Sequence, residues 1–141
     1  MGTWDVGPFN NDTAADWSGD LHDAVSDQRL PLIRATLSAV VDESDTYLDN
    51  PLADRAIAAA AVVASQLPGG QPLVTAYAPD FLLDGGTLDI PADIPLLALR
   101  ALHRIFGDNS EWHDLWQDAG RYAEAVDALR AVRATLERAA A

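Results

Sequence analysis

The segment Asn50-Pro-Leu-Ala-Asp-Arg-Ala-Ile-Ala-Ala-Ala-Ala-Val-Val-Ala-Ser-Gln-Leu67 is the strongest structural signal in the chain. Asn50-Pro51 predicts a helix start with Asn50 as the N-cap, because proline is tolerated in a first turn, where the amide hydrogen that it lacks has no partner. Pro68-Gly69-Gly70 predicts the end near Leu67. The side chains between are apolar on almost every face, and such a helix is normally buried. We therefore expect this helix to be the core of a helical bundle.

Two helices are expected before this core. From Asn11 to about Val25, apolar residues recur at three- and four-residue steps, as on one face of a helix. The second helix carries Leu30, Ile33, Leu37, Val40 and Val41 on one side. We expect Pro31 to lie in its first turn, for the reason that applies to Pro51.

Pro/Gly clusters bracket an irregular connection over residues 68–91. A short helix near 76–83 is expected there, with a strand or hairpin through 73–77 as the alternative. Apolar spacing then predicts helices over about 94–106, from about 108 to Gly120, and over about 121–138. Asp108 and Glu111 stand three apart, which predicts a capping box at the second of these. The predicted fold is a single all-α domain over 1–141, a compact bundle of five to six helices.

The first seventeen residues are rich in aromatic and turn-forming types, so we expect this segment to be tied into the fold. In a structural interpretation Trp4 and Phe9 close the end of the bundle, and Asn11 or Asp12 caps the first helix. In a functional interpretation Trp4, Asn11 and their neighbours line a ligand or partner surface, because tryptophan is enriched at binding hot spots. The structural interpretation is favoured, since each residue has a folding role.

A sequence pattern at the N-terminus resembles that of a known family. It comprises Gly2, Gly7, Pro8, Phe9, Asn11, Asp12, Ala14 or Ala15, and Asp16. This pattern resembles the opening of a bacterial family described as domain of unknown function 4259. The segments 99–105, 109–112 and 115–116 are similar to the C-terminal half of the same family. The resemblance implies a bacterial protein and gives no activity.

The chain is strongly acidic, with nine arginines, no lysine and 22 acids for a net charge of −13. Residues 1–96 hold 15 of the acids but only Arg29, Arg34 and Arg55, whereas residues 97–141 are nearly neutral. Phosphate backbones are bound by lysine and arginine, so we expect no direct nucleic-acid binding.

An acidic stripe follows the first predicted helix. Asp12, Asp16, Asp20, Asp23 and Asp27 fall within a sector of roughly 80° at ~100° per residue, opposite the apolar face. The favoured interpretation is a solvated face. The alternative is a site for Mg²⁺ or Mn²⁺, which prefer carboxylate oxygens, with a second cluster at Asp42, Glu43, Asp45 and Asp49 and with Arg29 or Arg34 binding a phosphate.

Several kinds of chemistry lack their sequence signatures. Without cysteine there is no disulfide or thiolate site, and without lysine there is no P-loop or Schiff base. The histidines His22, His103 and His113 lie on three different predicted helices, so we expect no metal site and no cofactor. No signal peptide and no apolar run of ~20 residues is present, so we expect a cytoplasmic protein with no membrane segment.

These observations favour a small, non-enzymatic protein-binding module. In one version an immunity-type or antitoxin-type domain uses the acidic stripe to bind a basic protein, with charge complementarity speeding the encounter. One alternative is a metal-dependent helical phosphohydrolase that uses the same acids. Another is a homo-oligomer formed through the alanine-rich helix or through Trp112 and Trp116, which we otherwise expect in the core with Tyr122.

Overall fold

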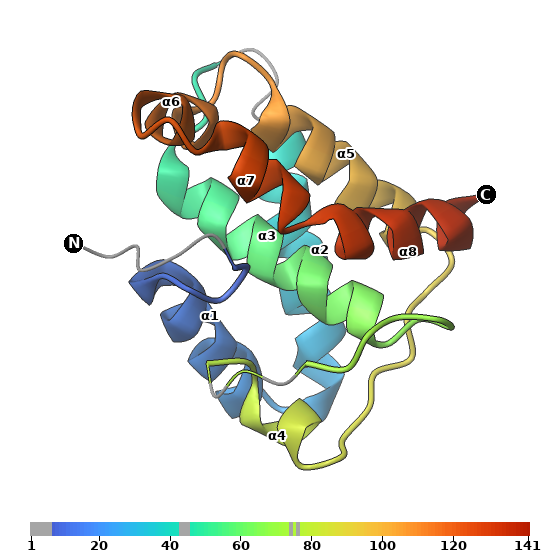
Figure 1. Cartoon of the computed structure of the whole chain (residues 1–141). Helices are drawn as coiled ribbons and strands as arrows, with labels where there is room; N and C mark the ends of the chain where they lie inside the picture. The colour runs from blue at the N-terminus through green and yellow to red at the C-terminus, as the bar shows by residue number, and fades with distance from the viewer. Residues whose placement is uncertain (1–6, 43–45, 74, 76) are drawn as a thin grey trace.

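The computed structural model describes residues 7–42, 46–73, 75 and 77–141. Helices joined by turns make up this part of the chain, and no strand occurs in it (Figure 1). The helices are α1 (Asp12–Asp23), α2 (Ser26–Val41), α3 (Asn50–Ser65), α4 (Asp80–Leu83), α5 (Ile94–Phe106), α6 (Glu111–Asp118), α7 (Tyr122–Asp127) and α8 (Arg130–Ala140). The predicted all-α fold is confirmed, with eight helices in the described ranges where five or six were expected.

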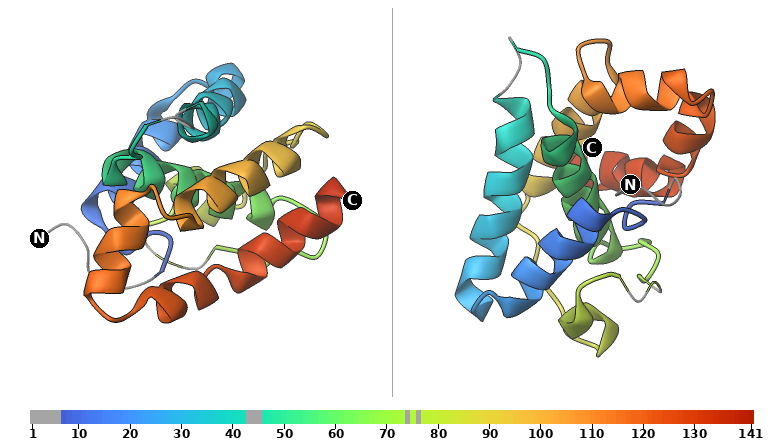
Figure 2. Two further views of the ribbon diagram at one scale, coloured as in Figure 1. Left: turned by 90° about the horizontal axis from the view of Figure 1, so that it is seen from above. Right: turned by 90° about the vertical axis from the view of Figure 1, so that its left-hand side faces the viewer.

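The centre of the bundle is α3, as its composition predicted. It packs against α1, α2, α5, α6 and α8, and the two views of Figure 2 place it between α2 and the α7–α8 arm. Every side chain from Ala56 to Ala64 is buried. The alanines let neighbouring helices approach closely, while Ile57, Val62 and Val63 supply apolar area worth roughly 1.5–3 kcal/mol for each buried side chain. The helix begins one residue earlier than expected, with Asp49 as N-cap.

The N-terminal segment is tied to this core in its described part. Phe9 is only 2% exposed, and the Asn11 side chain caps α1, its Oδ1 accepting the Ala14 amide at 2.7 Å. On α1 the buried residues are Ala14, Trp17, Ser18 and Leu21. These contacts support the structural interpretation of the segment. Trp4 lies outside the described residues.

The first helix ends earlier than expected, and the second begins earlier. Ala24 and Val25 are extended, and Val25 is 64% exposed where the periodicity predicted a buried residue. Because α2 starts at Ser26, Pro31 lies inside the helix, and its placement in the first turn is wrong. The ring of Pro31 is exposed, so it does not disturb the core.

A side chain from α2 stabilises this break. Arg29 donates to the carbonyl oxygens of Leu21 (Nε, 3.1 Å) and His22 (Nη2, 2.7 Å) at the end of α1. Its guanidinium also lies 3.6 Å from the ring centroid of Phe81 on α4. The last carbonyls of a helix need such partners, and a cation there interacts favourably with the helix dipole. Arg29 therefore joins α1, α2 and α4.

The connection between α3 and α5 contains the expected short helix, α4, and no strand in its described residues. Gly70 is required for the exit from α3, since a Cβ there would lie 1.9 Å from the carbonyl oxygen of Ala64.

The C-terminal half differs from expectation at two helix ends. Ser110, rather than Asp108, caps α6, so the predicted capping box is wrong. The predicted end at Gly120 is confirmed: its φ is +71°, and the backbone amide of Arg121 donates to the Trp116 carbonyl at 2.9 Å. The last predicted helix is two helices, α7 and α8, because the chain turns at Ala128 and buries Leu129.

Candidate functional site

The acids of the predicted stripe that lie on α1 form one outward surface, which we call the acidic face: Asp12, Asp16, Asp20 and Asp23. All four are exposed, whereas Trp17 and Leu21 on the other side of the helix are buried. With the described residues, none of the four forms an ion pair. The acidic face therefore presents its negative charge to solvent.

The remaining predicted binding residues lie elsewhere. Asp27 is exposed but belongs to the first turn of α2, so its assignment to the same helix is wrong. Asn11 is 8% exposed, and its side chain is engaged in the α1 cap. Trp4 is outside the described residues.

The described residues of the alternative metal site do not form a metal-binding group. Within the described ranges no group of three or more histidines and acids is positioned to hold a metal ion. Asp42 and Asp49 are exposed, and Glu43 and Asp45 are outside these ranges. Arg29 caps α1, and Arg34 pairs with Asp93 before α5.

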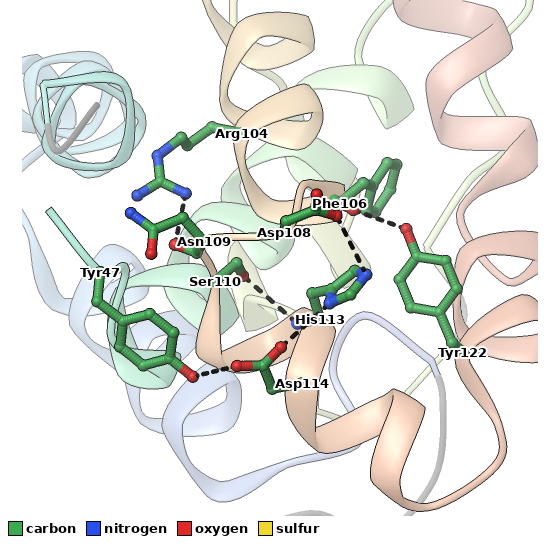
Figure 3. A network of polar contacts seen from close by, with 9 residues as sticks. All are labelled: Tyr47, Arg104, Phe106, Asp108, Asn109, Ser110, His113, Asp114 and Tyr122. Atoms are coloured by element: carbon green, nitrogen blue, oxygen red, sulfur yellow. Dashed lines mark hydrogen bonds and ion pairs between the residues drawn. The ribbon is translucent and has the colours of Figure 1, made fainter. Parts of the chain in front are cut away.

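A polar junction joins the segment 46–50 to α6 and the loop before it (Figure 3). The Leu48 amide donates to the Asn109 carbonyl at 3.1 Å, and the Glu111 amide donates to the Leu48 carbonyl at 2.9 Å. Arg104 of α5 donates to the carbonyl oxygens of Thr46 and Asn109. These contacts fix the entry to α3 against the start of α6.

Asp114 is the most connected carboxylate of this junction. It accepts the Tyr47 hydroxyl at 2.7 Å and lies 3.2 Å from His113 Nδ1. The Tyr47 hydrogen bond, and then that of His113, hold the pKa of Asp114 below its usual range. The same bond to Asp114 raises the pKa of Tyr47 to about 12.

The geometry around His113 is that of a structural contact. Its Nε2 lies 3.9 Å from Asp108, so both ring nitrogens face carboxylates (Figure 3). The nearby hydroxyl of Ser110 is fully buried and accepts the His113 backbone amide at 3.4 Å. A serine nucleophile needs its hydroxyl hydrogen-bonded to an imidazole nitrogen. The Ser110 hydroxyl is instead bonded to the backbone amide of His113.

Asp54 is a buried carboxylate on the mostly apolar α3 that the sequence pattern did not single out. It is 7% exposed, and its Oδ2 accepts the Asn50 side-chain amide at 2.9 Å. Glu111 of α6 accepts the Asn50 backbone amide at 2.7 Å. Burial, opposed by the Asn50 hydrogen bond and assisted by the Glu111 charge, raises the pKa of Asp54 to about 7. The available signal was an acid within a helix predicted to be buried on all sides.

His22 and the C-terminal aromatics occupy structural positions, whereas His103 is exposed on α5. His22 Nδ1 accepts the Phe81 amide at 3.1 Å, so this ring links α1 to α4. Trp112 is 4% exposed and packs against Phe106 and Tyr122, with ring centroids 5.4 and 6.1 Å away. The prediction that Trp112 belongs to the core is confirmed, whereas Trp116 is only partly buried against it.

Comparison with known proteins places the chain in a family. No curated protein and no solved structure matches it. No helix in the described part of the chain is long and apolar enough to cross a membrane. The family model for the domain of unknown function DUF4259 matches residues 2–128. Since this match covers most of the 141 residues, the chain belongs to the DUF4259 family.

Proposed function

We propose that this protein binds a basic protein partner through the acidic face of α1 and is not an enzyme. The observation that supports the proposal is that the four carboxylates of this face are exposed together without arginine partners among the described residues. Asp93, by contrast, is paired with Arg34.

The dimensions of the acidic face suit a protein surface. Asp12 and Asp23 are eleven residues apart, which corresponds to ~16 Å along a helix. Such a row is complementary to several lysine or arginine side chains on a partner. Charge complementarity of this kind mainly raises the association rate and selects against acidic partners. Neutralisation of a basic toxin by an immunity-type or antitoxin-type domain is one form of this function.

The proposal can be tested by affinity capture from a lysate of the source cells at ~50 mM and ~500 mM salt, between which the screening length falls from roughly 14 to roughly 4 Å. The test variant is Asp16→Asn/Asp20→Asn/Asp23→Asn. The control variant, Asp84→Asn/Asp89→Asn/Asp118→Asn, removes the same charge from exposed positions elsewhere.

The expected result is a basic protein that the wild type and the control capture at low salt, and that the test variant does not. If both variants captured less partner by the same amount, the binding would depend on the net charge of the chain. If both captured as much as the wild type, the acidic face would have no role. Capture that persists at high salt would also contradict the electrostatic mechanism.

A further inference from the structure

A cavity of about 230 Å³ lies where four segments of the chain meet. Its walls come from the C-terminal end of α3, the loop that follows, the start of α8, and Pro8 and Phe9 of the N-terminal sequence pattern. Figure 1 shows the end of α3 beside α8, against which it packs. No residue of α1 belongs to these walls, so the cavity is separate from the acidic face.

Small side chains leave this space open between α3 and α8. Ala61 and Ala64 belong to the wall on α3, and Ala131 belongs to the wall on α8. A methyl group does not fill the volume that a larger core side chain would occupy. Ala61, Ala64 and Phe9 are buried, whereas Ala131 and Gln71 are exposed. The cavity therefore has a buried floor on α3 and opens to solvent beside α8.

The walls of the cavity carry no charged side chain, although 22% of the residues in the chain are charged. An ion inside it would lose water without gaining an ionic partner from the wall, which is costly. The cavity therefore favours an uncharged occupant over an ion of either sign.

Thr135 is buried, unlike the other polar residues of the wall. It is 4% exposed, and its Oγ1 accepts a hydrogen bond from Arg138 Nη2 at 3.3 Å. No described residue accepts the hydrogen of this hydroxyl. A buried donor without a partner is destabilising, so an acceptor atom on a ligand would stabilise it.

The volume of the cavity limits the size of the occupant. A cavity of ~150 Å³ with apolar walls holds one benzene molecule, whereas drug-sized ligands occupy roughly 300–1,000 Å³. At about 230 Å³, this cavity suits one ring or branched aliphatic group with a small substituent. We propose that it is a binding site for an uncharged molecule of this size, with one acceptor atom that takes the hydrogen bond of the Thr135 hydroxyl.

A titration of the full chain with benzyl alcohol, followed by methyl NMR, tests the proposal. This probe has one ring and one oxygen acceptor. We expect saturable shifts of the methyl signals of Ala64, Ala131 and Val132, with a dissociation constant near or below about 1 mM. Nuclear Overhauser effects from the ring to the same methyl groups should locate the probe. Benzoate and benzylamine, which carry a charge beside the same ring, should bind at least about tenfold more weakly.

Two substitutions on α8 form a matched pair. Ala131→Leu adds bulk to the wall of the cavity, and Ala139→Leu makes the same change at an exposed position outside it. The first should weaken the binding of benzyl alcohol at least about tenfold, because the longer side chain occupies the site, and the second by less than about twofold.

Thr135→Val tests the hydrogen bond, because it removes the hydroxyl and nearly keeps the shape of the side chain. It should weaken the binding of benzyl alcohol about fivefold. Toluene has the same ring without an acceptor, and its affinity should not fall.

The absence of saturable shifts up to about 10 mM benzyl alcohol would overturn the proposal. So would Overhauser effects to methyl groups elsewhere, equal affinity for the charged probes, or unchanged affinity of Thr135→Val for benzyl alcohol. The titrations and Overhauser effects use the wild type, so they decide the matter even if Ala131→Leu does not fold.

Discussion

Side chains with defined partners cap the starts of α1 and α6, and Asn11 makes the shorter of the two hydrogen bonds. Its side chain accepts the Ala14 amide at 2.7 Å at the start of α1. Asn11→Ala removes this cap and should lower the free energy of unfolding by about 1 kcal/mol. Asn11→Ser supplies another good capping residue and should keep most of the stability. Thermal unfolding of the three proteins provides the measurement, and equal melting temperatures would show that the cap has no energetic role.

Asp54 makes the stability of the protein depend on pH in a definite direction. Its pKa is raised to about 7 in the folded protein from 3.8, so the native state holds a proton that the unfolded state releases. This contribution to stability is complete below pH 4 and is lost as the pH rises to about 7. Asp54→Asn should therefore match the wild type near pH 4 and be more stable at pH 8, by at most about 4 kcal/mol at ~1.4 kcal/mol per pKa unit.

Urea unfolding of both proteins at pH 4.5 and 8 measures this difference. If the variant were less stable than the wild type at pH 8, the ionised Asp54 carboxylate would have to be well paired. That result would contradict our expectation, which is based on the burial of Asp54 and its neutral hydrogen bond from Asn50.

Among the helices, the junction of α1, α2 and α4 depends on one residue of α2. Arg29 donates to two carbonyl oxygens at the end of α1 and stacks on Phe81 of α4. Arg29→Met keeps much of the apolar stem but removes the hydrogen bonds and the charge. We expect a loss of about 1 kcal/mol and faster hydrogen exchange at the end of α1 and in α4.

Arg34→Met is the matched control for this prediction, because Arg34 lies on the same helix in an exposed ion pair with Asp93. Such pairs contribute little to stability. If the two substitutions had the same effect on α1 and α4, Arg29 would have no special role at the junction.

Helices with a strong periodic signal were predictable from the sequence, and those shaped by distant contacts were not. The burial of α3, the extent of α5 and the end of α6 at Gly120 follow from local composition. The breaks after Asp23 and at Ala128 carry no glycine or proline. The first depends on Arg29 satisfying the carbonyl oxygens of α1, and the second on burial of Leu129, so both arise from tertiary contacts.

In the candidate sites too, features set by local periodicity were predictable and features set by distant contacts were not. Local periodicity correctly predicted that four acids of α1 share an exposed face, because a helix of known direction determines which side chains point outward. Local periodicity could not predict that Glu111 accepts the backbone amide of Asn50, because these two residues meet only through the packing of α6 on α3. The raised pKa of Asp54 follows first from its burial and then from the charge of Glu111, which are both tertiary effects.

Across the whole molecule, the negative charge is concentrated in the N-terminal part of the sequence and the arginines in the C-terminal part. Residues 97–141 hold six of the nine arginines, whereas the acidic face lies on α1, which packs on α3 and carries no arginine. A protein with a net charge of −13 attracts cations over its entire surface. A specific binding site must therefore bind its partner more strongly than the rest of the acidic surface does.

The most direct measurement is the dissociation constant of the captured partner at ~50 mM salt, for the wild type and for the two triple variants with equal net charge. If the acidic face is the binding surface, Asp16→Asn/Asp20→Asn/Asp23→Asn should weaken binding at least about tenfold, or ~1.4 kcal/mol. Asp84→Asn/Asp89→Asn/Asp118→Asn should change it by less than about twofold. Equal weakening in the two variants, or none in either, would contradict the account.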